Sequence, residues 1–429
     1  MENSVKNLIQ FIDHSPSCFH VIENAKKQFL EHGFIQLEEK EHWNLEEGKS
    51  YFVERNGSSM IAFHLPKKDF QGFHIVASHS DSPTYRIKEQ PEMSVEKHYT
   101  KLNIERYGGM IPETWFDRPL SVAGRIIIEE NGQIKDQLVN IDRDLMIIPN
   151  LAIHMSRSSN ESKQLNPQKD LLPLCGGNLT KDAFEEMIAK ESGVEKEDIL
   201  SYDLFLYNRM RGTTLGINEE FVAAPKLDDL ECAYSSIEGM LNAKLSKDYV
   251  TVCAVFDNEE VGSGTKQGAG STFFPEVLKR ISYLCGKNEE EYYMAVADSF
   301  MLSADNAHAV HPNYQDKTDP TNRPYINEGI VLKYNASQKY TTDANSAALV
   351  KYLCKKEKIR CQVFFNRSDM LGGSTLGNIL TGQVSIKAAD IGLPQLSMHS
   401  TYETAGCKDL GDMITLMRSF YELGKEVQI

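Results

Sequence analysis

Alternating runs of apolar and polar residues divide the first part of the chain into predicted helices and strands. Between residues 17 and 31, Phe19, Ile22 and Phe29 recur at helical spacing, which predicts one apolar helix face. Shorter apolar runs follow and predict strands. The pattern therefore predicts two helices and then three strands, at residues 4–12, 17–31, 51–54, 59–65 and 73–81.

The second half of the chain shows the same alternation of apolar strands and amphipathic helices. Leu230, Ala233 and Ile237 line one face of a helix that begins near Asp228, and the apolar run from Thr251 predicts a buried strand. Further strands are predicted at residues 330–334, 361–365 and 384–390, and further helices at 275–286, 342–356, 374–381 and 406–424. This alternation favours an α/β domain with helices on both faces of a mixed sheet, a three-layer α/β/α fold.

A stretch of different texture separates these two parts. Residues 106–125 are rich in glycine, proline and aromatic residues, and Asn131-Gly132 lies between two apolar runs as a hairpin turn would. We therefore expect a β-rich domain inserted into the α/β domain. The predicted division is 1–92 for the first segment of the α/β domain, 93–222 for the insertion and 223–429 for the second segment.

Composition and charge narrow the classes of function. The chain of 429 residues carries a net charge of −15 and has no stripe of clustered Lys and Arg, which argues against binding to nucleic acid. It begins without a basic-then-apolar leader and has no apolar run of membrane-spanning length, so no membrane association is expected. Its eight cysteines are scattered without a CxxC pair, which favours reduced thiols in a cytoplasmic protein.

The apolar strand that begins at Thr251 ends abruptly in acidic residues. Its sequence, TVCAVFDNEEVGSG, puts Glu259 and Glu260 near the carboxyl end of the strand, where open α/β sheets carry their chemistry. If the segment is extended, the two side chains point in opposite directions, so that one can bind a metal ion and the other can act on water. The alternative is an ordinary acidic loop, since paired glutamates are common on solvated loops.

The strand at residues 73–81 shows the same change from apolar to polar. In FHIVASHSD, His79 and Asp81 are two residues apart, and in an extended segment both side chains face the same way. An imidazole beside an aligned carboxylate suits a metal ion such as Zn²⁺. For this pair taken alone, the alternative is a histidine that is hydrogen-bonded to an aspartate without metal.

Histidines and acids recur at the ends of other predicted elements. Asp228 opens a predicted helix, where the alternative role of an acid is to stabilise the helix dipole. The complete set of candidates is His79, Asp81, Asp228, Glu259, Glu260, Asp305 and His399. Imidazole and carboxylate ligands suit Zn²⁺, Mn²⁺ or Co²⁺, and these residues are more than one catalytic zinc ion requires. They suffice for two ions about 3.5–4 Å apart that share one carboxylate, with one glutamate left free to move a proton.

Taken in order, several stretches resemble those of the M18 metallopeptidases, the aspartyl aminopeptidase or aminopeptidase I family. The resemblance spans nearly the full chain and is carried by ASHSDSP, TWFDRPLSVAGR, IPNLAIHMSR, KLDDLE, FDNEEVGSGTKQGAGS, SADNAHAVHPNY, VLKYNASQKYTT and IGLPQLSMHSTYETAG. It implies an aminopeptidase that removes single residues from peptide N-termini with two divalent metal ions, zinc first and manganese or cobalt as alternatives. It also implies that the inserted domain serves dimerisation and that the dimers assemble into a tetrahedral dodecamer.

The same resemblance assigns the metal ligands. It implies that His79 and Asp305 bind one metal ion, that Glu260 and His399 bind the other, and that Asp228 bridges the two.

Other residues receive catalytic or substrate-side roles by the resemblance. Glu259 would be the general base, and Asp81 would orient the first metal-binding histidine. His154 of the inserted domain would reach the active site of a neighbouring subunit and stabilise the oxyanion, while His308 and Lys333 would line the substrate side. For the last three the alternatives are an interface histidine, a hydrogen-bonded support and a charge at a strand edge, respectively.

Some positions depart from the family pattern near the expected substrate site. Asp369-Met370-Leu371-Gly372-Gly373 stands where the family usually has an aspartate, small residues or proline, and then Cys-Gly. The first expectation for the released residue is Asp or Glu, and the alternative is a neutral or apolar residue, which Met370 and Leu371 would suit. A related dinuclear deacylase or carboxypeptidase, and a non-catalytic assembly protein that retains metal for structure, are the remaining alternatives.

Overall fold

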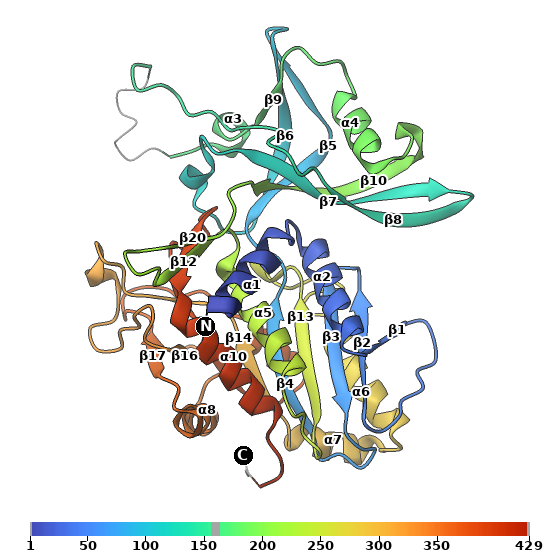
Figure 1. Cartoon of the computed structure of the whole chain (residues 1–429), viewed down its shortest axis with the longest axis vertical. Coiled ribbons are helices and arrows are strands. Elements are labelled where there is room, and N and C mark those ends of the chain that lie inside the picture. Colours follow the sequence, from blue (N-terminus) through green and yellow to red (C-terminus); the bar gives the residue numbers. More distant parts are fainter. Residues whose placement is uncertain (1, 156–163, 427–429) are drawn as a thin grey trace.

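The computed structural model describes residues 2–155 and 164–426. Within these ranges, one body contains a large mixed sheet with helices on both sides, and a second body above it contains a separate sheet (Figure 1). The predicted α/β class is confirmed, including the β-rich stretch between the two α/β parts. None of the described helices is long and apolar enough to cross a membrane.

The large sheet contains, among the described residues, nine strands of mixed direction. The central strands β13 (Val250–Phe256), β4 (Phe73–His79) and β14 (Phe300–Ala304) are parallel and buried along their whole length. Because both faces of these strands are covered, their sequences are continuous apolar runs. The spatial order is β1 (Ile35–Leu37), β2 (Lys49–Arg55), β3 (Ser59–Leu65), β13, β4, β14, β18 (Lys387–Gly392), β16 (Ile330–Tyr334) and β17 (Cys361–Phe365).

Two hydrophobic cores, one on each face of the large sheet, make the three predicted layers. Successive residues of β13 point to opposite faces, so that Cys253 and Val255 join one core while Val252 and Ala254 join the other. The first core includes residues of α1 (Glu2–Asp13), α2 (Cys18–Glu31), α5 (Leu227–Leu241), α8 (Ala344–Glu357) and α10 (Cys407–Tyr421). The second includes residues of α6 (Phe273–Leu284), α7 (Glu289–Ala297) and α9 (Leu376–Gln383).

The upper body contains a second sheet of six strands within the described ranges. Its order is β8 (Gln133–Asn140), β7 (Leu120–Glu130), β10 (Ile199–Asn208), β5 (Thr84–Val95), β6 (Tyr99–Tyr107) and β9 (Leu174–Gly176). Asn131 and Gly132 join β7 to β8, as the hairpin pattern predicts. The predicted boundary at residue 93 falls within β5, and we therefore propose that the insertion spans this sheet, from Thr84 to Asn208.

Shorter helices and strands belong to one body or the other, or form a third, small sheet. The helices α3 (Pro167–Asp170) and α4 (Ala183–Ser192), with the short 3-10 helices η1 (Pro112–Trp115) and η2 (Lys196–Asp198), belong to the upper body. The 3-10 helices η3 (Glu259–Val261) and η4 (Gln315–Lys317) belong to the lower body. A third sheet has the order β11 (Thr213–Leu215), β12 (Phe221–Ala224), β20 (Glu403–Gly406), β19 (Pro394–Leu396) and β15 (Ala307–His308).

Leu302 in β14 offers a test of the central packing. Its side chain is fully buried in the first core. We expect Leu302→Ala to lower the free energy of unfolding by about 2–5 kcal/mol, because it removes buried methyl groups and leaves a cavity. Denaturant unfolding followed by circular dichroism measures this change. The control is Leu371→Ala, at a fully exposed side chain, and an equal loss in both variants would contradict the burial described above.

Candidate metal centre

The parallel strands β4, β13 and β14 bring several candidate residues to one edge of the large sheet. His79 is the last residue of β4, Asp305 directly follows β14, and Glu259 begins η3 shortly after β13. The carboxyl ends of parallel strands meet at the same edge, where open α/β sheets carry their ligands. The apolar runs that end in polar residues are therefore neighbours in space as well as similar in sequence.

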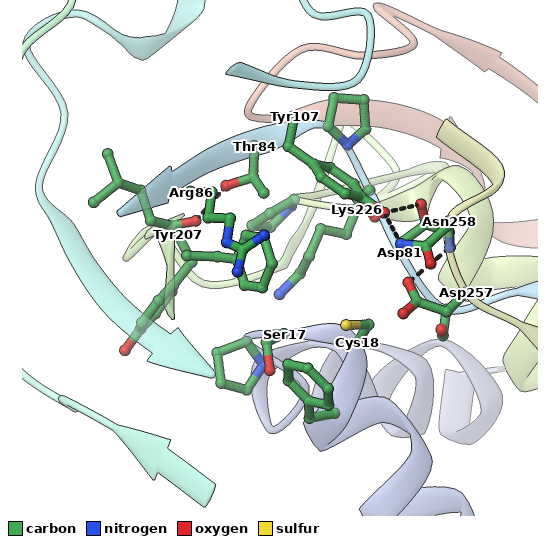
Figure 2. Close-up of a pocket in the computed structure, with 18 of the residues that line it drawn as sticks. Ser17, Cys18, Asp81, Thr84, Arg86, Tyr107, Tyr207, Lys226, Asp257 and Asn258 are labelled. Carbon is green, nitrogen blue, oxygen red and sulfur yellow. Dashed lines mark hydrogen bonds between the residues drawn. The ribbon is translucent and has the colours of Figure 1, made fainter. Parts of the chain in front are cut away.

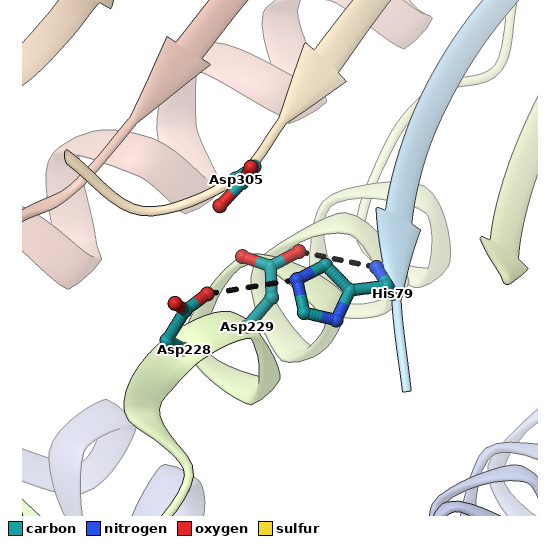
Figure 3. A group of neighbouring side chains, drawn as sticks. All are labelled: His79, Asp228, Asp229 and Asp305. Carbon is teal, nitrogen blue, oxygen red and sulfur yellow. Dashed lines mark hydrogen bonds and ion pairs between the residues drawn. The ribbon is translucent and has the colours of Figure 1, made fainter. Parts of the chain in front are cut away.

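Figure 3 shows a first group of side chains that point toward one another from β4, α5 and the end of β14. The group consists of His79, Asp228, Asp229 and Asp305, all buried, with one potential ligand atom from each within 4.8 Å of the others. Asp229 also accepts a hydrogen bond of 3.1 Å from the backbone N–H of His79. An imidazole and three carboxylates at this spacing could hold a divalent cation.

A second group shares one member with the first. Asp228, Glu260 and His399 also offer ligand atoms within 4.8 Å of one another. His399 Nε2 lies 3.4 Å from Asp228 Oδ2 and 3.4 Å from Glu260 Oε2. On its other side, Asp228 Oδ1 lies 3.5 Å from His79 Nε2. Asp228 thus faces both groups, as a carboxylate that bridges two cations must do.

The hydrogen bonds of these acids test whether the site fits a metal ion. Within the described part of the chain, Asp228 Oδ1, Asp229 Oδ1 and Glu260 Oε1 are buried and accept no hydrogen bond. An unpaired buried carboxylate oxygen is costly, and a divalent cation satisfies it. The donor set and its unpaired oxygens therefore fit metal binding.

Crowding of buried charges shifts the pKa values of the group in opposite directions. Burial raises the pKa of Glu260 well above its usual range, and the neighbouring Asp228 charge adds to this effect. Burial alone lowers the pKa of His79, but Asp228 and Asp81 raise it well above the usual value. For Asp228, burial raises the pKa, but His399 and His79 bring it below the usual range. The two imidazoles thus stabilise the ionised form of Asp228.

Glu259 belongs to neither group. Burial raises the pKa of this residue to about 8. The prediction that Glu259 and Glu260 diverge in an extended segment is wrong, because the segment turns into η3 directly after Asn258, whose φ is 63°. The two carboxylates nevertheless differ, since Glu260 faces His399 and Glu259 remains outside both sets of ligand atoms.

Asp81 lies behind His79 and connects it to the turn that carries both glutamates. Asp81 Oδ1 is 3.3 Å from His79 Nδ1. The Asp81 carboxylate also accepts hydrogen bonds from the backbone N–H groups of Glu259 at 3.1 Å and Glu260 at 3.2 Å. Tyr107 donates its hydroxyl hydrogen to the same carboxylate at 2.7 Å, as Figure 2 shows. Asp81 therefore fixes the imidazole and the turn together.

A cavity of about 260 Å³ lies on the far side of Asp81 (Figure 2). Its walls come from the start of α2, from the six-stranded sheet and from the segment before α5, and include Cys18, Arg86 and Lys226. The cavity thus lies between the candidate metal centre, the start of α2 and the six-stranded sheet.

Three residues near the centre had no predicted role. Asp229 joins the first group, Tyr107 bonds Asp81, and Glu403 accepts hydrogen bonds from the backbone N–H groups of Asp228 at 3.0 Å and His399 at 2.7 Å. The local signals were that Asp229 adjoins Asp228 and that Glu403 follows His399 by four residues.

The remaining predicted residues lie outside both groups. His154 is exposed in a turn of the inserted domain, and His308 is exposed at the end of β15, with its ring centre 6.1 Å from that of Phe364. Lys333 in β16 is 2% exposed, and its ammonium donates a hydrogen bond of 2.6 Å to the backbone oxygen of Asp305. Their catalytic or substrate-side roles stay predictions.

Known proteins resemble this chain over nearly its full length. The family described as aminopeptidase I zinc metalloprotease (M18) matches residues 11–421. A probable M18 family aminopeptidase 2 from Clostridium acetobutylicum is 45% identical over 431 residues, which cover 97% of this chain and 98% of that protein.

Solved structures show the same likeness. A chain in the cryo-EM structure of the Ape4 and Nbr1 complex matches with a TM-score of 0.95 and 36% identity, covering 98% of this chain and 85% of that one. The S. cerevisiae mApe1 dodecamer matches with a TM-score of 0.85 and 26% identity, covering 98% of this chain and 97% of its own. With two groups of potential metal ligands at one edge of its sheet and a family match over nearly its full length, the chain belongs to the M18 family of zinc aminopeptidases.

Proposed function

We propose that this aminopeptidase uses two divalent metal ions, zinc as the first choice and manganese or cobalt as alternatives, to release single residues from peptide N-termini. The observation that carries the proposal is the position of Asp228, whose oxygens lie 3.5 Å from His79 and 3.4 Å from His399. A carboxylate shared between two sets of ligands supports a pair of ions over a single one.

The proposed ligands follow the two groups. His79 and Asp305 hold one ion, Glu260 and His399 hold the other, and Asp228 bridges them. Asp229 is an additional carboxylate beside the first ion, since its oxygen lies within 4.8 Å of the ligand atoms of that group.

Two further residues act on protons and orientation. When bound, the pair of ions supplies an activated water molecule and polarises the scissile carbonyl. Glu259 takes a proton from the attacking water and delivers it to the leaving amine. Glu259 can act in this way because it lies outside both sets of potential ligand atoms, which leaves its carboxylate free. Asp81 orients His79 through their 3.3 Å contact.

Assembly completes the proposed site. The exposed His154 stabilises the oxyanion in the active site of a neighbouring subunit, and the inserted domain mediates dimerisation. The dodecameric assembly of the related mApe1 supports a homo-oligomer. We propose that this homo-oligomer is a tetrahedral dodecamer built from dimers. The eight free cysteines support a role in the reducing cytoplasm.

The proposed substrate preference concerns the N-terminal residue that is released. Acidic N-terminal residues are the first expectation, with His308 and Lys333 on the substrate side. Neutral or apolar residues are the alternative, and the exposed side chains of Met370 and Leu371 are available for them. A deacylase, a carboxypeptidase or a non-catalytic assembly protein has less support, because the chain belongs to an aminopeptidase family.

Replacing the proposed general base tests the mechanism. We expect Glu259→Gln to lower peptidase activity by about 10²- to 10⁴-fold, because the amide cannot take up the proton of the attacking water. Metal content, measured by inductively coupled plasma mass spectrometry, should not change. Glu290→Gln, at an exposed glutamate of α7, is the matched control and should keep full activity. Survival of activity in Glu259→Gln at unchanged metal content would overturn the assigned role.

A substrate panel tests the reaction class and the preferred residue. Peptides that begin with Asp, Glu, Leu or Met are compared with their N-acetylated forms, with Zn²⁺, Mn²⁺ and Co²⁺ supplied separately. We expect hydrolysis of the free peptides only, and fastest for the acidic ones. Release from the acetylated peptides alone would instead favour a deacylase.

Mixing two inactive variants tests whether His154 acts on a neighbour. We expect His154→Ala to lose activity without loss of metal. Co-expression of His154→Ala with Glu259→Gln should restore part of the activity, because a mixed pair contains one site with an intact base and an intact histidine. The absence of restored activity in mixed oligomers, checked by two affinity tags, would contradict action across subunits.

A further inference from the structure

Glu403, the first residue of β20, is a buried acid with two separate hydrogen bonds. Its side chain is 2% exposed. Oε2 accepts the backbone N–H of Asp228 at 3.0 Å, and Oε1 accepts the backbone N–H of His399 at 2.7 Å. One side chain thus holds the backbone of the proposed bridging ligand and that of a ligand to the second ion, which are 171 residues apart in sequence.

The two segments that Glu403 holds have irregular backbone. His399 has a φ of 66°, a left-handed conformation that is costly for a residue with a side chain. Asp228 has non-helical dihedral angles, with φ −82° and ψ 109°, although it lies within the bounds of α5. Neither backbone N–H donates a hydrogen bond within a regular helix at this point. Each therefore needs an acceptor from another part of the chain.

Strand pairing puts Glu403 in position to reach both segments. In the third sheet, Glu403 pairs with Ala224 of β12, which leads directly to Asp228. The same strand β20 begins shortly after His399. The sheet therefore sets the distance between the segments that carry Asp228 and His399, and the Glu403 carboxylate accepts a hydrogen bond from each of them.

A carboxylate is the side chain that this position requires. Two N–H groups from different segments need two acceptor oxygens, and a glutamine offers only one. Glu403 is also absent from both groups of potential metal ligands, and each of its oxygens is already bonded to an N–H. Both oxygens of this buried side chain are thus used by the two backbone segments, which argues that these hydrogen bonds are the reason for its presence.

We propose that Glu403 is a positioning residue that fixes the backbones of Asp228 and His399, and thereby sets the affinity of the centre for its second metal ion. The inference rests on the two-metal site proposed above and adds a residue to it that touches neither metal nor substrate. Glu403 acts only through the two ligands whose N–H groups it accepts.

Metal binding to Glu403→Gln tests this role. We expect the apparent affinity for the more weakly bound Zn²⁺, measured by competition with a chelator, to fall about 10- to 100-fold, the range typical of residues that orient metal ligands. With Co²⁺ in place of Zn²⁺, the visible absorption spectrum should change, because the ligand geometry is altered. At saturating metal, the kcat of Glu403→Gln should lie closer to the wild-type value than its metal affinity does.

Asp409→Asn is the matched control for this experiment. Asp409 in α10 is fully buried, and its two oxygens accept the backbone N–H groups of Asn327 at 2.6 Å and Gly329 at 2.7 Å. The same chemical change thus removes the same kind of contact away from the proposed ligands. We expect Asp409→Asn to lower thermal stability but to leave metal affinity and the Co²⁺ spectrum unchanged.

The outcomes separate this inference from the proposed function. A wild-type protein that binds no pair of ions would overturn the two-metal proposal. A wild-type protein that binds two ions, with equal affinities in Glu403→Gln and Asp409→Asn, would overturn the role of Glu403 alone. If Glu403→Gln does not fold, Glu403→Asp provides the test. This variant keeps both acceptor oxygens on a shorter side chain, so we expect a smaller loss of metal affinity than a missing acceptor causes. Wild-type metal affinity in Glu403→Asp would count against the inference.

Discussion

Carboxylates that converge in a largely buried site repel one another, and the arrangement of this molecule's centre depends on how that repulsion is offset. Asp228, Asp229, Asp305 and Glu260 all bury their side chains within a few ångströms of two imidazoles. In the part of the chain that the structure describes, several of these oxygens accept no hydrogen bond, and a divalent cation could satisfy them. The metal-binding character of the site thus follows from its unpaired acids as much as from its histidines.

Strands of the third sheet flank several of these acids and histidines in sequence. Its strand β12 leads to Asp228, β15 begins just after Asp305, and β19 and β20 lie on either side of His399. The strands of this sheet are short, and β12, β15, β19 and β20 each lie close in sequence to a candidate ligand. A small sheet of this kind can fix the relative positions of loops that the large sheet brings only to the same edge.

Much of the fold is predictable because burial imposes a period on each element. The continuous apolar run that begins near Thr251 forms the strand β13, and the helical spacing between residues 17 and 31 forms α2. Asn131-Gly132 forms the expected hairpin turn. The contact between His79 and Asp81 also follows from local geometry, since two residues at this spacing face the same way. The prediction that Glu259 and Glu260 point in opposite directions is wrong for a local reason. The chain leaves the extended conformation at Asn258, and the backbone N–H of Glu259 then donates a hydrogen bond to Asp81.

The sequence by itself determined which kinds of residue end the strands, and therefore that the chemistry is that of imidazole and carboxylate ligands. Only the tertiary structure decided that Asp229 faces His79 and that Glu403 joins two distant backbones. The physical reason is that periodicity fixes the faces of one element at a time. Which ends meet depends on pairing between strands far apart in the chain, and no local pattern records that pairing.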